Sequence, residues 1–312
     1  MAQVYTVAGW NTSRKGPGMT APTPASPTGT PRDMSVLLRA AATGQAVGDA
    51  LGVPFEFRIR DSFRCDGMVG HGTHDRPAGT WSDDTAMMLA TLDSLAANRG
   101  RVDPMDLLRR FRDWMDRGAY TPDGVVFDIG GTTSSALVHG HGGDGEMDNG
   151  NGSLMRILPL AFVDCSDDDV RAASAVTHAH PTSTGACVRF VRVARSLIRG
   201  HADPVEWSRA AGVDDLASAP RDTIRSGGYV LDTLRAALWC LATTGSYADC
   251  VLEAVNLGAD ADTTAAVAGG LAGIRYGLDA NPWRSRLRGL DMLDGIVDRA
   301  AAAFDAADAW IG

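Results

Sequence analysis

The chain of 312 residues has a formal net charge of −9 and 45% hydrophobic residues. This length and composition allow a sizeable buried core. An acidic chain lacks the clustered basic surface that usually binds nucleic acid or an anionic membrane, so neither partner is indicated. No apolar run approaches the roughly 20 residues of a membrane-spanning helix, and the first 30 residues contain no apolar secretory core. These features predict a cytoplasmic protein.

The amino-terminal segment has a composition of its own. Residues 1–33 are rich in proline, threonine and glycine, most densely from Thr20 to Pro31. Such a segment cannot bury a core. We therefore predict a disordered leader over 1–33 and a folded domain over 34–312. Met19 and Met34 are alternative starts.

Helical periodicity dominates from Ser35 onward. Alanine- and leucine-rich stretches place apolar residues on one helix face, and alternating β-branched runs are nearly absent. The body is therefore predicted to be all-α. The predicted helices cover residues 35–51, 83–98, 104–117, 167–177, 184–199, 229–243, 247–256, 262–277 and 293–309.

Two of these predicted helices carry glycines spaced four residues apart. Residues with this spacing share one helix face, and glycine there lets another backbone approach closely. Glycine costs about 1 kcal/mol relative to alanine inside a helix, so three in register indicate a packing role. We predict two tightly packed central helices with the stripes Gly44, Gly48, Gly52 and Gly269, Gly273, Gly277.

Acidic clusters stand at two predicted helix starts, SDDT over 82–85 and DADT over 260–263. Taken alone, the first cluster has a structural interpretation, because Ser82 can cap a helix whose first turn favours acidic residues. A second cluster changes this interpretation. Like-charged carboxylates repel one another, and a bound cation is a reason to gather them.

Together the clusters offer four carboxylates and two hydroxyls, with no cysteine or histidine interleaved. Hard oxygen donors suit Mg²⁺ or Mn²⁺ rather than zinc. If the two helix starts face each other, the site could hold two metal ions that orient a substrate hydroxyl and an attacking water. The candidate metal ligands are Ser82, Asp83, Asp84, Asp260, Asp262 and Thr263.

Glu56 is a candidate for proton transfer. Pro54 predicts the end of the first helix and leaves Glu56 on a loop between Phe55 and Phe57. A loop glutamate considered alone is expected to be exposed. Its aromatic neighbours also fit a carboxylate in a partly apolar wall, where its pKa would rise into a useful range.

Two glycine-rich segments, DIGGTTSS over 128–135 and NGNGSLMR over 149–156, each run toward a predicted short helix. Exposed backbone N–H groups at a helix start form an anion site, so both are candidates to bind a diphosphate and a ribose. Such loops are mostly simple turns. The GxGxxG match over 140–145 follows no predicted strand and does not indicate a dinucleotide-binding fold. The histidine pairs 139/141 and 178/180 lack HExxH spacing, so no zinc site is predicted.

These motifs together resemble the ADP-ribosylglycohydrolase family, which includes dinitrogenase reductase-activating glycohydrolase and the animal ADP-ribosylarginine and ADP-ribosylserine hydrolases. The resemblance runs from about residue 36 to 277. Its ordered elements are GQAVGDALGVPFEF, WSDDTAMM, DIGGTTSSAL, GNGSLMRILPLA, the Thr177–His178 step, GYVLDTL and AVNLGADADTTAAVAGGLAGIRYG.

The resemblance implies a compact single-domain orthogonal helical bundle with a binuclear Mg²⁺ site, or Mn²⁺ in its place. The implied metal ligands coincide with the six oxygen-donor residues above. Glu56 would engage the distal ribose or water, and Asp128 would act as an acid or base in the arginine-directed branch. The implied ADP-ribose cleft is formed by Gly130, Gly131, Asn151, Gly152, Ser153 and His178.

The implied activity is removal of ADP-ribose from a modified protein. The serine of SDDT is more similar to the arginine-directed enzymes and favours that linkage. Two alternatives stay open: hydrolysis of a free ADP-ribosyl metabolite such as O-acetyl-ADP-ribose, and a non-catalytic relative that binds ADP-ribose or has a structural role.

Overall fold

The regular structure consists of α-helices joined by turns and short 3₁₀ helices. The computed structural model describes residues 33–201, 203–213, 216–277 and 279–312, so the predicted leader lies outside the described residues except for Asp33. Within these ranges no strand forms, and the fold is all-α as predicted. The helices are α1 (Met34–Gly52), α2 (Asp83–Ala97), α3 (Pro104–Arg117), α4 (Gly131–His139), α5 (Asp167–Ala175), α6 (Pro181–Ile198), α7 (Pro204–Ala211), α8 (Val230–Thr243), α9 (Tyr247–Asn256), α10 (Ala261–Tyr276) and α11 (Leu290–Ala307).

Helix boundaries follow local capping. Helix α6 begins three residues before its predicted start, because Pro181 occupies the first helical position and the His180 ring accepts a hydrogen bond from the Thr182 N–H (3.2 Å). Helix α7 was not predicted. The segment 149–156 does not lead into an α-helix as expected, because its backbone forms turns followed by a 3₁₀ helix, Leu158–Ala161.

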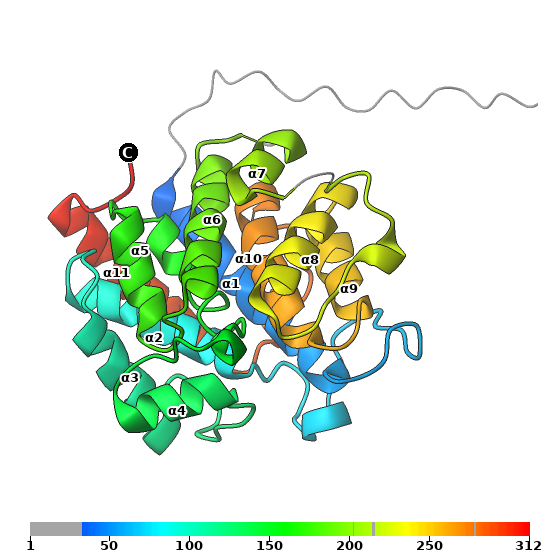
Figure 1. Cartoon of the computed structure of the whole chain (residues 1–312), viewed down its shortest axis with the longest axis horizontal. Helices are drawn as coiled ribbons and strands as arrows, with labels where there is room; N and C mark the ends of the chain where they lie inside the picture. Colours follow the sequence, from blue (N-terminus) through cyan, green and yellow to red (C-terminus); the bar gives the residue numbers. More distant parts are fainter. Residues whose placement is uncertain (1–32, 202, 214–215, 278) are drawn as a thin grey trace, which may run out of the picture. The chain divides into compact units, whose positions relative to one another are not determined.

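Helices α1 and α10 lie side by side at the centre of the bundle (Figure 1). Helix α10 also packs against α8 and α9, whereas α1 packs against α2 and α11. None of the described helices is long and apolar enough to span a membrane.

The glycine stripes account for this central pair. A methyl group on Gly44 would lie 2.3 Å from the Gly269 carbonyl oxygen, and one on Gly48 would lie 2.0 Å from that of Ala265. Side chains cannot fit in so small a gap, so the prediction of two tightly packed helices is confirmed. Gly277 does not belong to the stripe: it caps α10 with φ +83°, and no heavy atom would meet its Cβ.

The register of the two helices determines where the acidic clusters meet. A methyl group on Gly52, at the end of α1, would lie 2.3 Å from the Cα of Asp262, at the start of α10. The helices are thus antiparallel, with the carboxyl end of α1 against the amino end of α10. The second acidic cluster is thereby placed beside the loop that carries Glu56.

Candidate functional site

The amino end of α2 is held by a buried carboxylate of α1. Asp49 accepts hydrogen bonds from the backbone N–H of Ser82 (2.9 Å) and of Thr85 (3.0 Å) and from the Thr85 hydroxyl (2.6 Å). Burial raises the pKa of Asp49 to about 6. Ser82 caps the helix as predicted, accepting from the Asp84 N–H (3.3 Å). Asp49 was not among the predicted site residues.

The two acidic clusters meet beneath this cap. The Thr263 hydroxyl of α10 donates to Asp84 Oδ2 of α2 (3.3 Å), and the Ser82 hydroxyl donates to the same oxygen (3.0 Å). One carboxylate oxygen each of Asp49, Asp84 and Asp262 lies within 4.8 Å of the others. The structure therefore brings the predicted metal ligands of both helix starts together.

Several carboxylates of this cluster are buried without compensation. Asp84 Oδ1 and Asp262 Oδ2 have no hydrogen-bond partner among the described residues. Burial and the neighbouring acids raise the pKa of Asp83, Asp84 and Asp262 well above the usual range. Unpaired buried oxygens at this density fit a hard divalent cation. The donor set is entirely oxygen, which suits Mg²⁺ or Mn²⁺.

A pocket of about 270 Å³ opens beside the cluster. Its acidic wall includes Glu56, Asp83 and Asp260, and the Thr263 side chain completes it. The residues that were assigned from the sequence to catalysis or to the ADP-ribose cleft and that also line this pocket are Asp128, Gly130, Gly131, Asn151, Gly152 and His178.

Glu56 is buried at this pocket, with only 3% of its surface exposed. The expectation of an exposed loop glutamate is therefore wrong, because residues 71–76 cover it: the Thr73 hydroxyl donates to the Glu56 carbonyl (2.7 Å), and His74 Nε2 contacts Glu56 Oε2. Burial, followed by the charges of Asp128 and Asp260, raises the pKa of Glu56 to about 7. His74 was not predicted.

The loop before α4 contributes a strained backbone. Asp128 has φ +59°, a left-handed conformation that side-chain-bearing residues adopt at a cost and that is common at functional sites. Gly130 caps α4 without a side-chain hydrogen bond. Gly130, Gly131, Thr132 and Thr133 at this helix start line the pocket, and the free N–H groups of a first helical turn can bind an anion.

The second glycine-rich loop is tied to the acidic cluster. Asn151 Nδ2 donates to Asp260 Oδ2 (2.7 Å) and to the Thr233 hydroxyl (2.9 Å). A methyl group on Gly152 would lie 2.8 Å from His178 Cε1, so this position requires glycine. The structure does not bring the Ser153 side chain to the pocket. Its hydroxyl is buried in the core, where it accepts from Ser174 (2.9 Å).

Two buried residues, Arg156 and Thr177, hold the ring of His178 in one orientation. The fully buried Arg156 donates to the Thr177 hydroxyl (2.8 Å), which lies 2.8 Å from His178 Nδ1. Among the described residues, this hydroxyl has no other acceptor, so it donates to Nδ1 and leaves the proton on Nε2. Burial and the Arg156 charge lower the pKa of His178 to about 3. His178 therefore offers a neutral N–H donor to the pocket.

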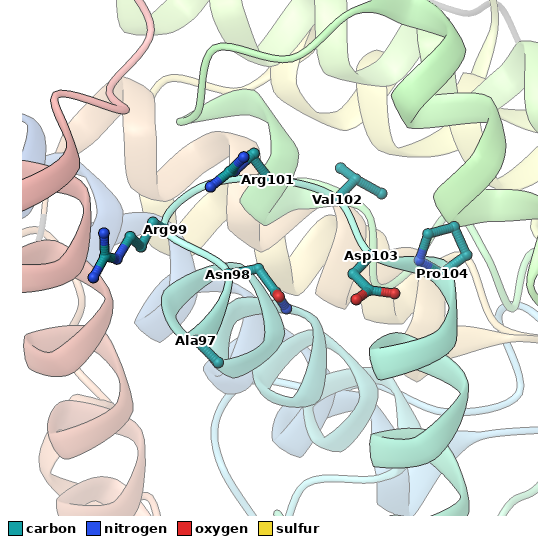
Figure 2. A pocket seen from close by; sticks show the side chains of 7 residues that line it. All are labelled: Ala97, Asn98, Arg99, Arg101, Val102, Asp103 and Pro104. Atoms are coloured by element: carbon teal, nitrogen blue, oxygen red, sulfur yellow. The ribbon is translucent and has the colours of Figure 1, made fainter.

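A second, larger hollow has different chemistry. It measures about 430 Å³ and follows the loop between α2 and α3, with Arg99 and Arg101 extending from that loop (Figure 2). Asn98 donates to the Ser94 carbonyl (2.9 Å), and Asp103 caps α3. Asn98 and Asp103 thus make hydrogen bonds at the end of α2 and the start of α3, and the two arginines are exposed. This hollow contains no buried unpaired group, so we place the functional site at the acidic pocket.

The all-α fold is that of a known class of hydrolases. The family model for ADP-ribosylglycohydrolase matches residues 33–309. A solved structure described as an ADP-ribosylglycohydrolase-related protein complex is 31% identical with a TM-score of 0.71, covering 88% of this chain and 99% of that one. The chain belongs to the ADP-ribosylglycohydrolase family and is an enzyme that hydrolyses a glycosidic bond.

Curated relatives extend along most of the chain. An ADP-ribosylarginine hydrolase of Pseudomonas putida is 35% identical, covering 81% of this chain and 74% of its own length. One from Serratia proteamaculans is 31% identical over 84% and 78%. The ADP-ribosyl-[dinitrogen reductase] glycohydrolase of Rhodospirillum rubrum is 34% identical over 78% and 87%.

Proposed function

We propose that this enzyme removes ADP-ribose from arginine side chains of a modified protein and that it requires two divalent cations, Mg²⁺ or Mn²⁺. The observation that carries the metal requirement is the pair of buried carboxylate oxygens without partners, Asp84 Oδ1 and Asp262 Oδ2. The residues that would hold the cations are Ser82, Asp83, Asp84, Asp260, Asp262 and Thr263.

Bound there, the cations would polarise ribose hydroxyls and water. The glycine-rich wall supports the assignment of a diphosphate subsite. Backbone N–H groups at the start of α4 and the neutral Nε2–H of His178 donate hydrogen bonds to an anion without adding positive charge. Gly130, Gly131 and Gly152 would let the substrate approach the backbone closely, and Asn151, whose side chain bonds Asp260, would border the same subsite. Ser153 would then act through the shape of its loop, since its hydroxyl is buried.

Glu56 is the proposed general base that takes the proton of the attacking water. Its carboxylate, buried at the pocket, accepts that proton as the water oxygen bonds to the anomeric carbon and the carbon–nitrogen bond breaks. The guanidine leaves neutral and regains a proton to become arginine. Asp128 lines the same pocket, with a carboxylate oxygen within 4.8 Å of one of Glu56, and is the proposed acid or base for that return.

Two observations favour arginine over other linkages. Both hydrolases of Serratia and Pseudomonas are described as acting on ADP-ribosylarginine. In addition, Glu56 and Asp128, the two pocket acids outside the proposed metal ligands, suit a cationic guanidinium group better than a neutral serine hydroxyl.

The test measures ADP-ribose released from matched peptides modified on arginine or on serine, with Mg²⁺ or with a chelator. We expect metal-dependent release from the arginine peptide only. Asp84→Ala and Asp262→Ala should abolish metal binding and turnover while the fold remains, whereas Asp168→Ala, at an exposed position of α5, should behave as wild type.

The remaining outcomes separate the alternatives. Release from the serine peptide would contradict the arginine linkage. Hydrolysis of O-acetyl-ADP-ribose with neither peptide cleaved would identify a free metabolite as the substrate. Tight ADP-ribose binding without any hydrolysis would indicate a binding protein, and full activity of either alanine variant would overturn the metal site.

A further inference from the structure

Residues 71–76 form a short strap across the turn that carries Glu56. The backbone N–H of His71 donates to the Arg76 carbonyl (2.5 Å) and closes the strap at its base. A methyl group on Gly72 would lie 2.1 Å from the Pro54 carbonyl oxygen, so the strap rests directly on the chain before Glu56. The Thr73 hydroxyl donates to the Glu56 carbonyl (2.7 Å). The strap is therefore anchored to the Glu56 backbone.

His74 is the residue of the strap whose side chain contacts the Glu56 carboxylate. Its Nε2 contacts Glu56 Oε2, and its side chain is 15% exposed. The ring lies 5.1 Å from the Phe127 ring and 6.1 Å from that of Phe57, measured between centroids. Phe127 is in turn covered by the Arg76 guanidinium at 5.3 Å. The imidazole thus has aromatic contacts that support it apart from its hydrogen bond.

Glu56 needs such a partner because its other neighbours repel it. One ligand atom each of Glu56, His74 and Asp128 lies within 4.8 Å of the others, and Asp260 adds a further negative charge. A glutamate has three rotatable side-chain bonds, and repulsion alone would turn the carboxylate away from Asp128. Among the described residues, His74 is the only side chain that hydrogen-bonds this carboxylate.

We propose that His74 is a positioning residue for Glu56: its Nε2–H holds Oε2 so that the second carboxylate oxygen, Oε1, is aimed at the attacking water. This inference rests on the proposed function. It assigns no proton transfer to His74, whose role is to keep the base in its reactive orientation at the pocket wall. Orientation of a reacting group within about 1 Å is worth large factors in rate.

Two substitutions separate the hydrogen bond from packing. His74→Phe keeps a ring between Phe57 and Phe127 but removes the donor, whereas His74→Gln keeps a donor. We expect kcat of the phenylalanine variant to fall about 10- to 100-fold with KM within about threefold. The glutamine variant should recover most of kcat. His71→Gln is the matched control, since His71 lies on the same strap and its exposed side chain pairs, among the described residues, only with Asp75.

A spectroscopic measurement tests the contact without any turnover. In protein labelled with ¹⁵N-histidine, the His74 Nε2 resonance is identified by its loss in the phenylalanine variant, and it should shift in Glu56→Gln. If wild type cleaves no ADP-ribosyl substrate, the proposed function fails while this measurement still decides the contact. Wild-type kcat in His74→Phe would overturn the inference. So would equal losses in both variants, or a resonance unmoved in Glu56→Gln.

Discussion

His178 shows how a single buried side chain can be held neutral. Arg156 is fully buried, stacks on the Phe111 ring at 4.4 Å and has no acidic partner among the described residues. Its donors reach the carbonyls of Ala173 and Ser174 and the Thr177 hydroxyl. Arg156 stays charged, since burial lowers its pKa only to about 10. The positive charge of Arg156 therefore opposes protonation of His178.

This neutrality has a consequence for stability. The pKa of His178 is about 3 in the folded protein, against an ordinary value of 6.5. Between these values the unfolded chain binds the extra proton, so the contribution of His178 to stability is complete above pH 6.5 and declines as the pH falls. The buried acids of the site, whose pKa values are raised, contribute the opposite slope in both proteins, so the effect is read from the difference: on lowering the pH, His178→Gln should gain stability relative to wild type by up to about 1.4 kcal/mol per unit.

Urea denaturation of both proteins from pH 4 to pH 7.5, without divalent cations, measures this slope. Thr177→Val is the useful comparison, because it keeps the histidine and the nearby charge and should retain the wild-type slope. Parallel curves for wild type and His178→Gln would show that His178 binds its proton as readily in the folded protein as in the unfolded chain.

Residue chemistry could be predicted from sequence where a motif repeats. The acidic clusters at 82–84 and 260–263 together predicted a shared metal site. Asp49 gave no such signal, because a single aspartate within an alanine-rich helix is compatible with many structural roles. Its place one residue after Gly48, in the stripe that faces α10, was the available clue. His74 had none: its contact with Glu56 depends on a strap whose path is set by tertiary packing.

At the scale of elements, the α1–α10 pair determines the site. The register that places Gly48 against Ala265 also places Gly52 against Asp262, so close packing and the position of the acidic cluster have the same cause. A change that separates the helices should therefore impair both folding and the site.

Gly48→Ala tests this coupling. The added methyl would lie 2.0 Å from the Ala265 carbonyl oxygen, a backbone atom that cannot rotate away. We expect the variant to lose about 3 kcal/mol of stability or more, or to fail to fold. Gly185→Ala in α6 is the control: its Cβ meets nothing within 4 Å, so it should gain about 0.5–1 kcal/mol. Thermal unfolding measures both, and a Gly48→Ala protein as stable as wild type would contradict the close contact.

The helices themselves could be predicted to the extent that local pattern defines them. Periodicity and capping gave α2, α3 and α9 to within about one residue. Helix α7 has only eight residues, too few for a clear period, and it was missed. The 149–156 loop was misjudged because its glycines favour turns as strongly as a helix start.

At the scale of the whole molecule, segments far apart in the chain converge on one acidic cluster. Asp49, Asp84 and Asp262 come from α1, α2 and α10. Helices α2 and α10, which are far apart in the sequence, are joined here by the hydrogen bond from the Thr263 hydroxyl to Asp84 (3.3 Å). Their mutual repulsion opposes folding in the absence of a counter-charge. A cation bound at this point stabilises all three helices together.

Divalent cations should therefore change the stability of the entire domain. With Mg²⁺ at about 100 times its dissociation constant, wild type should gain about 2.7 kcal/mol, seen as a single cooperative rise in Tm that a chelator reverses.

Asp262→Asn keeps the shape and the contact with the Thr263 N–H (2.9 Å) but removes one buried charge. In chelator this variant should unfold at a higher temperature than wild type, and Mg²⁺ should add little. Asp168→Asn should respond as wild type does. A wild-type Tm indifferent to Mg²⁺ and Mn²⁺, or an Asp262→Asn protein with the full response, would mean that this carboxylate cluster is stabilised by something other than a bound cation.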